Sequence, residues 1–328
     1  MDDSLGDVQR EFPHYRIEEE LTGVGRPRYA AKARNLDINP HTVVTADLGE
    51  LRAELSSSLA PLVTADKFDP HVAHPARVYA YWLGGKDHGP PDRQAAEEVI
   101  QHRPQVVAGA RANRYFLVRA VRYLAAEQGI RQFLDIGTGL PAPDNTHDVA
   151  QDIAPECRIV FADNDPLVLA HARALLTSAP EGACGYVDAN LRDTRTVLRD
   201  AAAMLDFSRP VGVLLLAVLH FIADADDPAQ IVGSLASALP PGSFIALSHL
   251  TRDFAPVEVT SGVDAYNSLV PMGIVPRTHS QVSALFGGLP LIAPGVVPVS
   301  EWRPWIGDPF PQPADLYAGV ATIPGRRG

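Results

Sequence analysis

Short apolar segments alternate with amphipathic segments along the second half of the chain. The apolar segments predict strands at residues 131–136, 158–162, 184–187, 213–219 and 244–248, with two later strands near 291–299 and 317–322. The unbroken apolar run at 213–219 is typical of a central parallel strand, which is buried on both faces. Because helical patterns separate the strands, we expect an α/β fold in which helices cover both faces of a mostly parallel sheet.

The first 128 residues follow a different pattern. Residues 1–65 predict a small α+β accessory segment, with strands at 28–33 and 42–45 and a helix at 48–56. Residues 66–102 are rich in His, Pro, Gly and aromatic side chains, so we expect a lid over a site and no regular core there. A long helix is expected at about 104–128. We expect its arginines to face solvent mostly: Arg111, Arg114, Arg119 and Arg122. The domain boundaries are therefore drawn at 1–65 and 66–328, with the lid and helices at 66–128 and the core at 129–328.

Composition narrows the classes of partner. The net charge of −11 argues against a nucleic-acid binder and against attachment to anionic lipid. The two cysteines, Cys157 and Cys184, have no zinc-type spacing, so no metal site is expected. The start of the chain lacks a signal pattern, and no apolar run approaches the ~20 residues that span a bilayer. A cytoplasmic location follows as the expectation, and a homodimer remains open.

A glycine-rich loop follows the first predicted strand of the core. Gly137 and Gly139 belong to the sequence GTGLPA, which fits a nucleotide-binding fingerprint for either NAD or S-adenosylmethionine. Asp135 favours the second ligand, because a carboxylate would oppose a pyrophosphate, whereas S-adenosylmethionine carries an ammonium and a sulfonium. Asp163 ends the second strand, where an acid accepts hydrogen bonds from ribose hydroxyls. The alternatives are a helix-capping role for Asp135 and a turn role for Asp163.

Several longer runs accompany this loop. They are ARVY (76–79), LGGKD (83–87), ARANR (110–114), RQFLDIGTGLP (131–141), DNDP (163–166), AVLH (217–220) and WRP (302–304). With these runs, the chain from about residue 69 to its end resembles an actinobacterial family of S-adenosylmethionine-dependent methyltransferases, formerly a domain of unknown function. The resemblance implies a Rossmann-like class I methyltransferase fold, whose seven-stranded, mostly parallel sheet has a final antiparallel strand.

The same resemblance implies a set of cofactor contacts. It places Asp135, Gly137, Gly139 and Asp163 at S-adenosylmethionine, with the backbone of Asn164 against the adenine. Asn190 stands where relatives carry an Asp that receives the adenine amino group, and an amide oxygen can also accept that bond. Leu191 and Ala217 complete the expected cofactor contacts.

Two further candidates have open alternatives. His147 is interpreted as a cofactor-side contact or a helix-start residue. Arg77 is expected to pair with the methionine carboxylate or with Asp87. Ala80 and His88-Gly89 depart from the pattern of the family within the expected lid, so the resemblance says less about the acceptor than about the cofactor.

Candidate catalytic residues follow from position alone. His220 comes at the end of the strand predicted at 213–219, beside the crevice where ligands bind in open α/β sheets, so it is the candidate base. A hydrogen-bonded structural histidine is the alternative. His249 and Arg277 are weaker candidates, the first by the same logic and the second as an anion site. Tyr79, Tyr81 and Trp82 are expected either to cover the ligands or to pack in the core.

These observations lead to one preferred function and two alternatives. The preferred function is methyl transfer from S-adenosylmethionine to a small-molecule acceptor. No Asn-Pro-Pro-Tyr motif follows the fourth strand, which disfavours amino-group methylation of nucleic acid or protein. A non-catalytic S-adenosylmethionine-binding regulatory or interaction protein is the main alternative. A nicotinamide-dependent oxidoreductase is disfavoured by Asp135.

Overall fold

The protein divides into two compact units. The computed structural model describes residues 4–13, 15–21, 27–33, 42–45, 47–58, 69–176, 178–305 and 314–325. One unit is Met1–Phe68 with Ala170–Leu176, and the other is Asp69–Leu169 with Thr177–Gly328. In the part of the chain so described, no helix is long and apolar enough to cross a membrane.

The smaller unit is built on a three-stranded antiparallel sheet. Its elements are α1 (Leu5–Glu11), β1 (Tyr15–Leu21), β2 (Pro27–Ala33), β3 (Thr42–Thr45) and α2 (Leu48–Ser58), and the strand order is β1-β2-β3. The strands β2 and β3 and the helix α2 were predicted, whereas α1 and β1 were not. In β1, Tyr15 and Ile17 face a small core with Leu51 and Leu55 of α2. Two buried positions among charged neighbours are too short an alternation to predict a strand.

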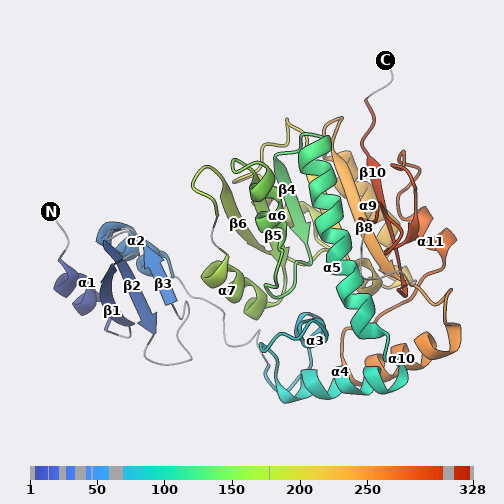
Figure 1. Cartoon of the computed structure of the whole chain (residues 1–328), viewed down its shortest axis with the longest axis horizontal. Coiled ribbons are helices and arrows are strands. Elements are labelled where there is room, and N and C mark those ends of the chain that lie inside the picture. Colours follow the sequence, from blue (N-terminus) through green and yellow to red (C-terminus); the bar gives the residue numbers. More distant parts are fainter. Residues whose placement is uncertain are drawn as a thin grey trace. The chain divides into compact units, whose positions relative to one another are not determined.

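The larger unit contains a seven-stranded sheet (Figure 1). Its strands are β4 (Gln132–Ile136), β5 (Arg158–Asp163), β6 (Ala183–Asp188), β7 (Gly212–Leu216), β8 (Phe244–Leu250), β9 (Val297–Pro298) and β10 (Leu316–Thr322). The order is β6-β5-β4-β7-β8-β10-β9, in which β10 runs antiparallel to β8 and β9, and the strands from β6 to β8 are parallel. The predicted α/β class, Rossmann-like topology and antiparallel final strand are confirmed.

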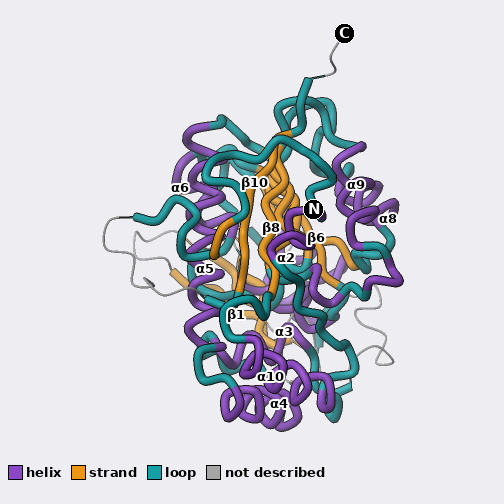
Figure 2. The backbone as a smooth tube through the Cα atoms, turned by 90° about the vertical axis from the view of Figure 1, so that its right-hand side faces the viewer, coloured by secondary structure: helices purple, strands orange, loops and turns teal. Residues whose placement is uncertain are grey.

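Helices cover both faces of this sheet. They are α5 (Val106–Arg122), which a π-helical turn continues over Tyr123–Glu127, α6 (Thr146–Ile153), α7 (Pro166–Leu175), α8 (Thr194–Ala201), α9 (Pro228–Ser237) and α11 (His279–Ala284). Figure 2 shows α5 and α6 on one side of the strands and α8 and α9 on the other. Asp165 and Asp227 each accept a backbone hydrogen bond from the first turn of α7 and α9, as an acid before a proline predicts.

Three further helices gather at one end of the sheet (Figure 1). They are α3 (Pro75–Trp82), α4 (Pro90–His102) and α10 (Pro256–Leu269), and we call them the cap. Val78, Val99, Tyr266 and Val270 form its buried core with several alanines. The expectation that residues 66–102 lack a regular core is therefore wrong. The prolines of this segment begin helices at N-terminal positions, where a missing N–H costs nothing.

A buried carboxylate joins α3 to α4. Asp92 accepts hydrogen bonds from the backbone N–H of His74 at 2.8 Å and of Gly89 at 2.7 Å, and one from Arg77 at 3.4 Å. His74 and Gly89 are the N-cap residues of α3 and α4. The Asp92 side chain therefore accepts one backbone N–H group at the start of each helix.

Arg119 corrects the expectation for the arginines of the long helix. Its side chain is buried, with Nε donating to the carbonyl of Trp302 at 2.8 Å and Nη2 donating to the carbonyl of Val299 at 2.6 Å. The range predicted as a strand at 291–299 forms only the two-residue β9, because prolines interrupt it. Its backbone carbonyls therefore have few partners on neighbouring strands. The guanidinium group supplies donors to those carbonyls.

Candidate functional site

A cavity of about 220 Å³ lies between the carboxyl ends of the parallel strands and the cap. It includes the point where the strand order reverses, between β4 and β7, which is the usual ligand site of an open α/β sheet. Most of the predicted site residues line it: Asp135, Gly137, Gly139, Asp163, Asn164, Asn190, Leu191, Ala217 and His220.

The glycine loop is folded tightly against its neighbours. Gly137 and Gly139 have φ angles of 73° and 68°, which L-residues with a side chain rarely adopt. A Cβ on Gly137 would lie 2.4 Å from a methyl carbon of Val218, so only glycine fits there. The backbone N–H of Gly139 donates to the carboxylate of Asp163 at 3.0 Å. The loop therefore brings bare backbone to the cavity between the ends of β4 and β5.

Asp135 is buried at the end of β4. Its Oδ2 accepts a hydrogen bond from the Thr146 hydroxyl at 2.6 Å, and burial raises the pKa of the carboxyl to about 6, with the charge of Asp163 adding to the rise. The alternative role as a helix-capping acid does not apply, since the partner is a side-chain hydroxyl. A buried carboxylate beside a second acid is stabilised by a cationic ligand.

Asp163 ends β5 and faces the same cavity. Its two oxygens accept the backbone N–H groups of Asp165, at 2.9 Å, and Gly139, while burial raises its pKa. A carboxylate has about four acceptor positions, so two remain for hydroxyl donors. The pair Asp135 and Asp163 gives this side of the cavity a negative charge and suits a ligand that is cationic and carries a ribose.

Asn190 and Ala217 form the neighbouring wall. The Asn190 Oδ1 accepts from the backbone N–H of Arg192 at 2.9 Å, which leaves one acceptor position. Ala217 has a φ of 51°, and its N–H donates to the Ser248 hydroxyl at 2.9 Å. This left-handed residue ends the strand at Leu216, so the range predicted at 213–219 is too long.

His220 consequently lies in a short 3-10 helix after β7, over Leu219–Phe221. Its ring lines the cavity, and Nδ1 is buried with no hydrogen-bond partner in the described part of the chain. Burial, and then the nearby His249 and Arg277, hold the pKa of His220 well below its ordinary value. The ring is therefore neutral at neutral pH and has a nitrogen lone pair to offer.

Arg277 and His249 support the loop behind His220. The guanidinium group uses all of its N–H groups on the carbonyls of Leu219 and Ile222, the carboxylate of Asp224 and the Nε2 of His249. His249 Nδ1 bonds to the carbonyl of Leu250 at 2.8 Å, and burial lowers the pKa of His249 to about 4. The role proposed for Arg277 as an anion site is wrong, because the protein occupies its donors. His249 cannot relay a proton from His220, since Arg277 holds its lone pair.

Two expected cofactor contacts do not line the cavity. Arg77 is buried in the joint between α3 and α4, where it bonds to Asp92 and, at 3.0 Å, to the carbonyl of Val72. His147 packs edge-on against Phe161 of β5 at 5.8 Å. His147 is thus a helix-start residue in the first turn of α6, as the alternative interpretation expects. Thr146, one position earlier, is the residue that reaches Asp135.

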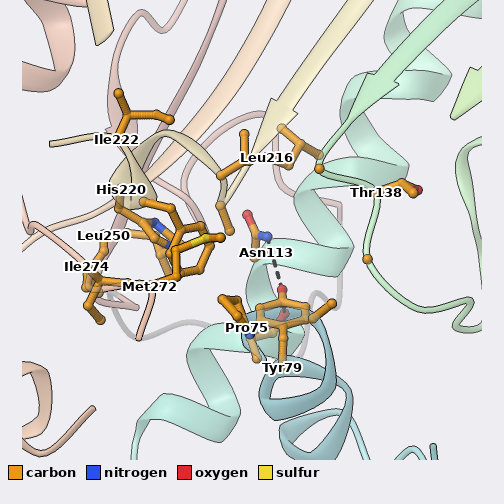
Figure 3. A pocket seen from close by; sticks show the side chains of 18 of the residues that line it. Pro75, Tyr79, Asn113, Thr138, Leu216, His220, Ile222, Leu250, Met272 and Ile274 are labelled. Carbon is orange, nitrogen blue, oxygen red and sulfur yellow. Dashed lines mark hydrogen bonds between the residues drawn. The ribbon is translucent and has the colours of Figure 1, made fainter. Parts of the chain in front are cut away.

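A series of hydrogen-bonded, buried polar side chains, which the sequence did not reveal, forms part of the cavity wall. Asn113 donates to the Tyr79 hydroxyl at 3.0 Å (Figure 3). Asn113 also accepts from the Ser248 hydroxyl at 2.5 Å, and the Tyr79 hydroxyl donates to the carbonyl of Ala110. Asn113 belongs to the run ARANR, but its partners are distant in sequence. Tyr79 and Trp82 line the cavity, as expected of ligand-covering aromatics, whereas the Tyr81 hydroxyl bonds to Glu97.

The described residues contain no group of three or more His, Cys, Asp or Glu side chains placed to bind a metal ion.

Comparison with known proteins identifies the cofactor of this protein. A model of the S-adenosyl methyltransferase family matches residues 62–324. The chain belongs to the S-adenosyl methyltransferase family. It is therefore an enzyme that uses S-adenosyl-L-methionine, and the buried acids and the uncrowded backbone at Gly139 fit this cationic methyl donor.

Two solved structures resemble this methyltransferase over most of its length. A DUF574 family protein from Streptomyces avermitilis is 42% identical, with 78% of this chain and 99% of that chain covered and a TM-score of 0.75. A Thermobifida fusca protein, provisionally assigned as a methyltransferase, is 36% identical, with 78% and 96% covered and a TM-score of 0.71. No protein of curated function matches the chain.

Proposed function

We propose that this enzyme transfers the methyl group to a small-molecule acceptor held between His220 and the cap. One observation carries the proposal: the cavity extends without interruption from the two acids at β4 and β5 to His220 and to the inner faces of α4 and α10. Cofactor and acceptor can then meet in one space that the cap shields from water, which favours in-line transfer by holding the reacting atoms together.

Within this proposal, the residues on the acid side hold the methyl donor. Asp135 faces its cationic part, Asp163 accepts the ribose hydroxyls, and the glycine loop lets the backbone approach closely. Asn164, Asn190 and Leu191 line the part of the cavity that would receive the adenine. S-adenosylmethionine, when bound, supplies a methyl group on a sulfonium sulfur and leaves as neutral S-adenosylhomocysteine.

His220 is proposed to receive the proton that the acceptor loses. The acceptor atom forms its bond to the methyl carbon, and its own proton then passes to the neutral imidazole and on to water. An oxygen that bears both a methyl group and a proton is a much stronger acid than an imidazolium. A histidine of low pKa is therefore basic enough, even though Arg277 and His249 disfavour its charged form.

Incubation with S-adenosylmethionine carrying a deuterated methyl group and a library of small hydroxyl and amine compounds tests the proposal. We expect mass spectrometry to find a labelled product together with S-adenosylhomocysteine, and to find less of both with Asp163→Ala when S-adenosylmethionine is limiting. Cofactor binding without transfer to any member of a broad library would contradict the proposed acceptor class and favour a non-catalytic role.

A further inference from the structure

The half of the cavity beyond His220 is walled by apolar side chains. They come from α5, β8, α10, β10 and the loop after α10: Val106, Leu250, Val263, Met272, Ile274 and Leu316. In Figure 3, Leu250, Met272 and Ile274 lie beside His220, whereas Thr138 of the glycine loop lies on the other side of Asn113. This half, which we call the acceptor compartment, is thus distinct from the half that contains the acids.

The charged side chains of the acceptor compartment neutralise each other. Arg103 donates from Nε and Nη2 to the two carboxylate oxygens of Asp315, at 2.7 and 3.0 Å. A planar, bidentate pair of this kind leaves little net field for a third charge. A charged acceptor would therefore lose its hydration without gaining a partner here.

One polar side chain on the wall of the compartment has an unpartnered atom in the described part of the chain. His220 lines the cavity, and its Nδ1 is buried with no hydrogen-bond partner there. The neutral ring offers an acceptor nitrogen, and a hydroxyl group is a small uncharged group that can donate to it.

We propose that the acceptor is an uncharged, mainly apolar molecule whose hydroxyl group lies against His220. This inference rests on the proposed function and narrows its acceptor class. It follows from the apolar wall, the self-neutralised pair of Arg103 and Asp315 and the unpartnered ring of His220.

The position of Gly262 allows a direct steric test. This glycine lies in α10 on the cavity wall, where a Cβ would meet only the Cβ of Arg103 at 3.5 Å and a methyl carbon of Val99 at 3.8 Å. We expect a phenylalanine there to reduce the space available in the acceptor compartment. Gly233 of α9 is a matched control, because it is exposed on a helix outside the cavity lining and a Cβ there meets nothing within 4 Å.

The experiment measures binding to the full chain saturated with S-adenosylhomocysteine. The probes are phenyl, naphthyl and anthracenyl series, each with a hydroxyl, a carboxylate and an aminomethyl member, followed by calorimetry or ligand-detected NMR. We expect at least one hydroxyl member to bind tenfold or more tightly than its two charged partners. Gly262→Phe and Met272→Trp should remove that binding, and Gly233→Phe should not.

The outcomes separate this inference from the proposed function. Equal or tighter binding of a charged member, no binding of any hydroxyl member, or unchanged binding in folded Gly262→Phe and Met272→Trp would overturn the inference. Cofactor affinity within about twofold of wild type in both variants would show that the donor side is intact. Failure of wild type to bind S-adenosylhomocysteine would instead overturn the function on which the inference rests.

A second binding experiment tests the proposed hydrogen bond between the acceptor hydroxyl and His220. Wild type should bind the hydroxyl probe several-fold more tightly than the corresponding methyl ether, which cannot donate a hydrogen bond. In His220→Phe the two probes should bind within about twofold of each other. A preference that persists in His220→Phe would place the hydroxyl elsewhere and contradict the proposal.

Discussion

At the scale of single residues, the site is built from ionisable groups that burial holds away from their ordinary pKa values. Asp135 and Asp163 were predictable because strand ends fix their place, and the glycines after β4 mark the loop. The chain Tyr79–Asn113–Ser248 was not, since residues from α3, α5 and β8 meet only in the fold. Arg77 and His147 do not line the cavity, because helical phase and local partners, rather than sequence proximity, decide where a side chain points.

Burial of the Asp135 carboxyl lowers the stability of the cofactor-free protein at neutral pH. Its folded pKa of about 6 exceeds the ordinary 3.8, so the folded state loses stability as the pH rises from about 4 to 6, and the loss persists above that range. Asp135→Asn should therefore raise the free energy of unfolding of the cofactor-free protein at pH 8 by about 1–3 kcal/mol. The same variant should bind S-adenosylmethionine more weakly. Urea unfolding at pH 8 and pH 4 tests this, and the gain should be small at pH 4. A variant that is less stable than wild type at pH 8 would refute it.

His220 has the opposite pH dependence. The unfolded chain takes up a proton near the ordinary pKa of 6.5, whereas the folded ring stays neutral well below that value. Its contribution to stability is thus complete above about pH 6.5 and is lost as the pH falls. We expect the unfolding free energy of His220→Gln to fall less steeply than that of wild type between pH 6 and 4, by about 1 kcal/mol per pH unit. Parallel curves for the two proteins would indicate that His220 is charged in the fold.

The same residue should affect turnover. His220→Gln keeps a polar side chain of similar reach but removes the basic nitrogen, so kcat should fall by about 10²-fold, the lower end for general-base catalysis. The Kd for S-adenosylhomocysteine should change little, because the proposed cofactor site lies on the acid side. Turnover equal to that of wild type would remove His220 from the reaction.

At the scale of elements, apolar patterning located the sheet but misjudged its edges. The run 213–219 stays apolar past the end of β7, and only the left-handed backbone of Ala217 turns the chain out of the strand. No hydrophobic pattern signals such a turn when the residue is not glycine. The cap was missed for a related reason: Pro, Gly and His suggested loops, although the prolines begin helices that bury small alanines against α10.

The joint between α3 and α4 should control the order of the cap. Asp92→Ala leaves the N–H groups of His74 and Gly89 and the guanidinium of Arg77 without their buried acceptor, which costs about 2–4 kcal/mol locally. We expect faster hydrogen exchange at 75–102 than in wild type, with β4 unaffected. Arg93→Ala, on the exposed side of the same helix, is the control and should match wild type. Unchanged exchange in Asp92→Ala would show that the apolar core alone holds the cap.

At the scale of the whole molecule, the fold places a negative half-cavity at the strand ends and an apolar half-cavity under the cap. The family match establishes the methyl donor, and the described geometry supports the proposal of a small acceptor. The fold class and much of the donor side could be predicted from sequence, because parallel strand ends meet at one edge whatever the loops do. The acceptor compartment could not, since it joins elements whose contacts arise only on folding.

Calorimetric titration of the full chain tests the central claim most directly. We predict one site that binds S-adenosylmethionine and S-adenosylhomocysteine but not NADH, and a loss of about 1–3 kcal/mol of binding free energy in Asp163→Ala, whose charged acceptor positions for ribose are gone. Absence of binding by both sulfur ligands, or affinity in Asp163→Ala equal to that of wild type, would contradict the assignment of this cavity as the methyl-donor site.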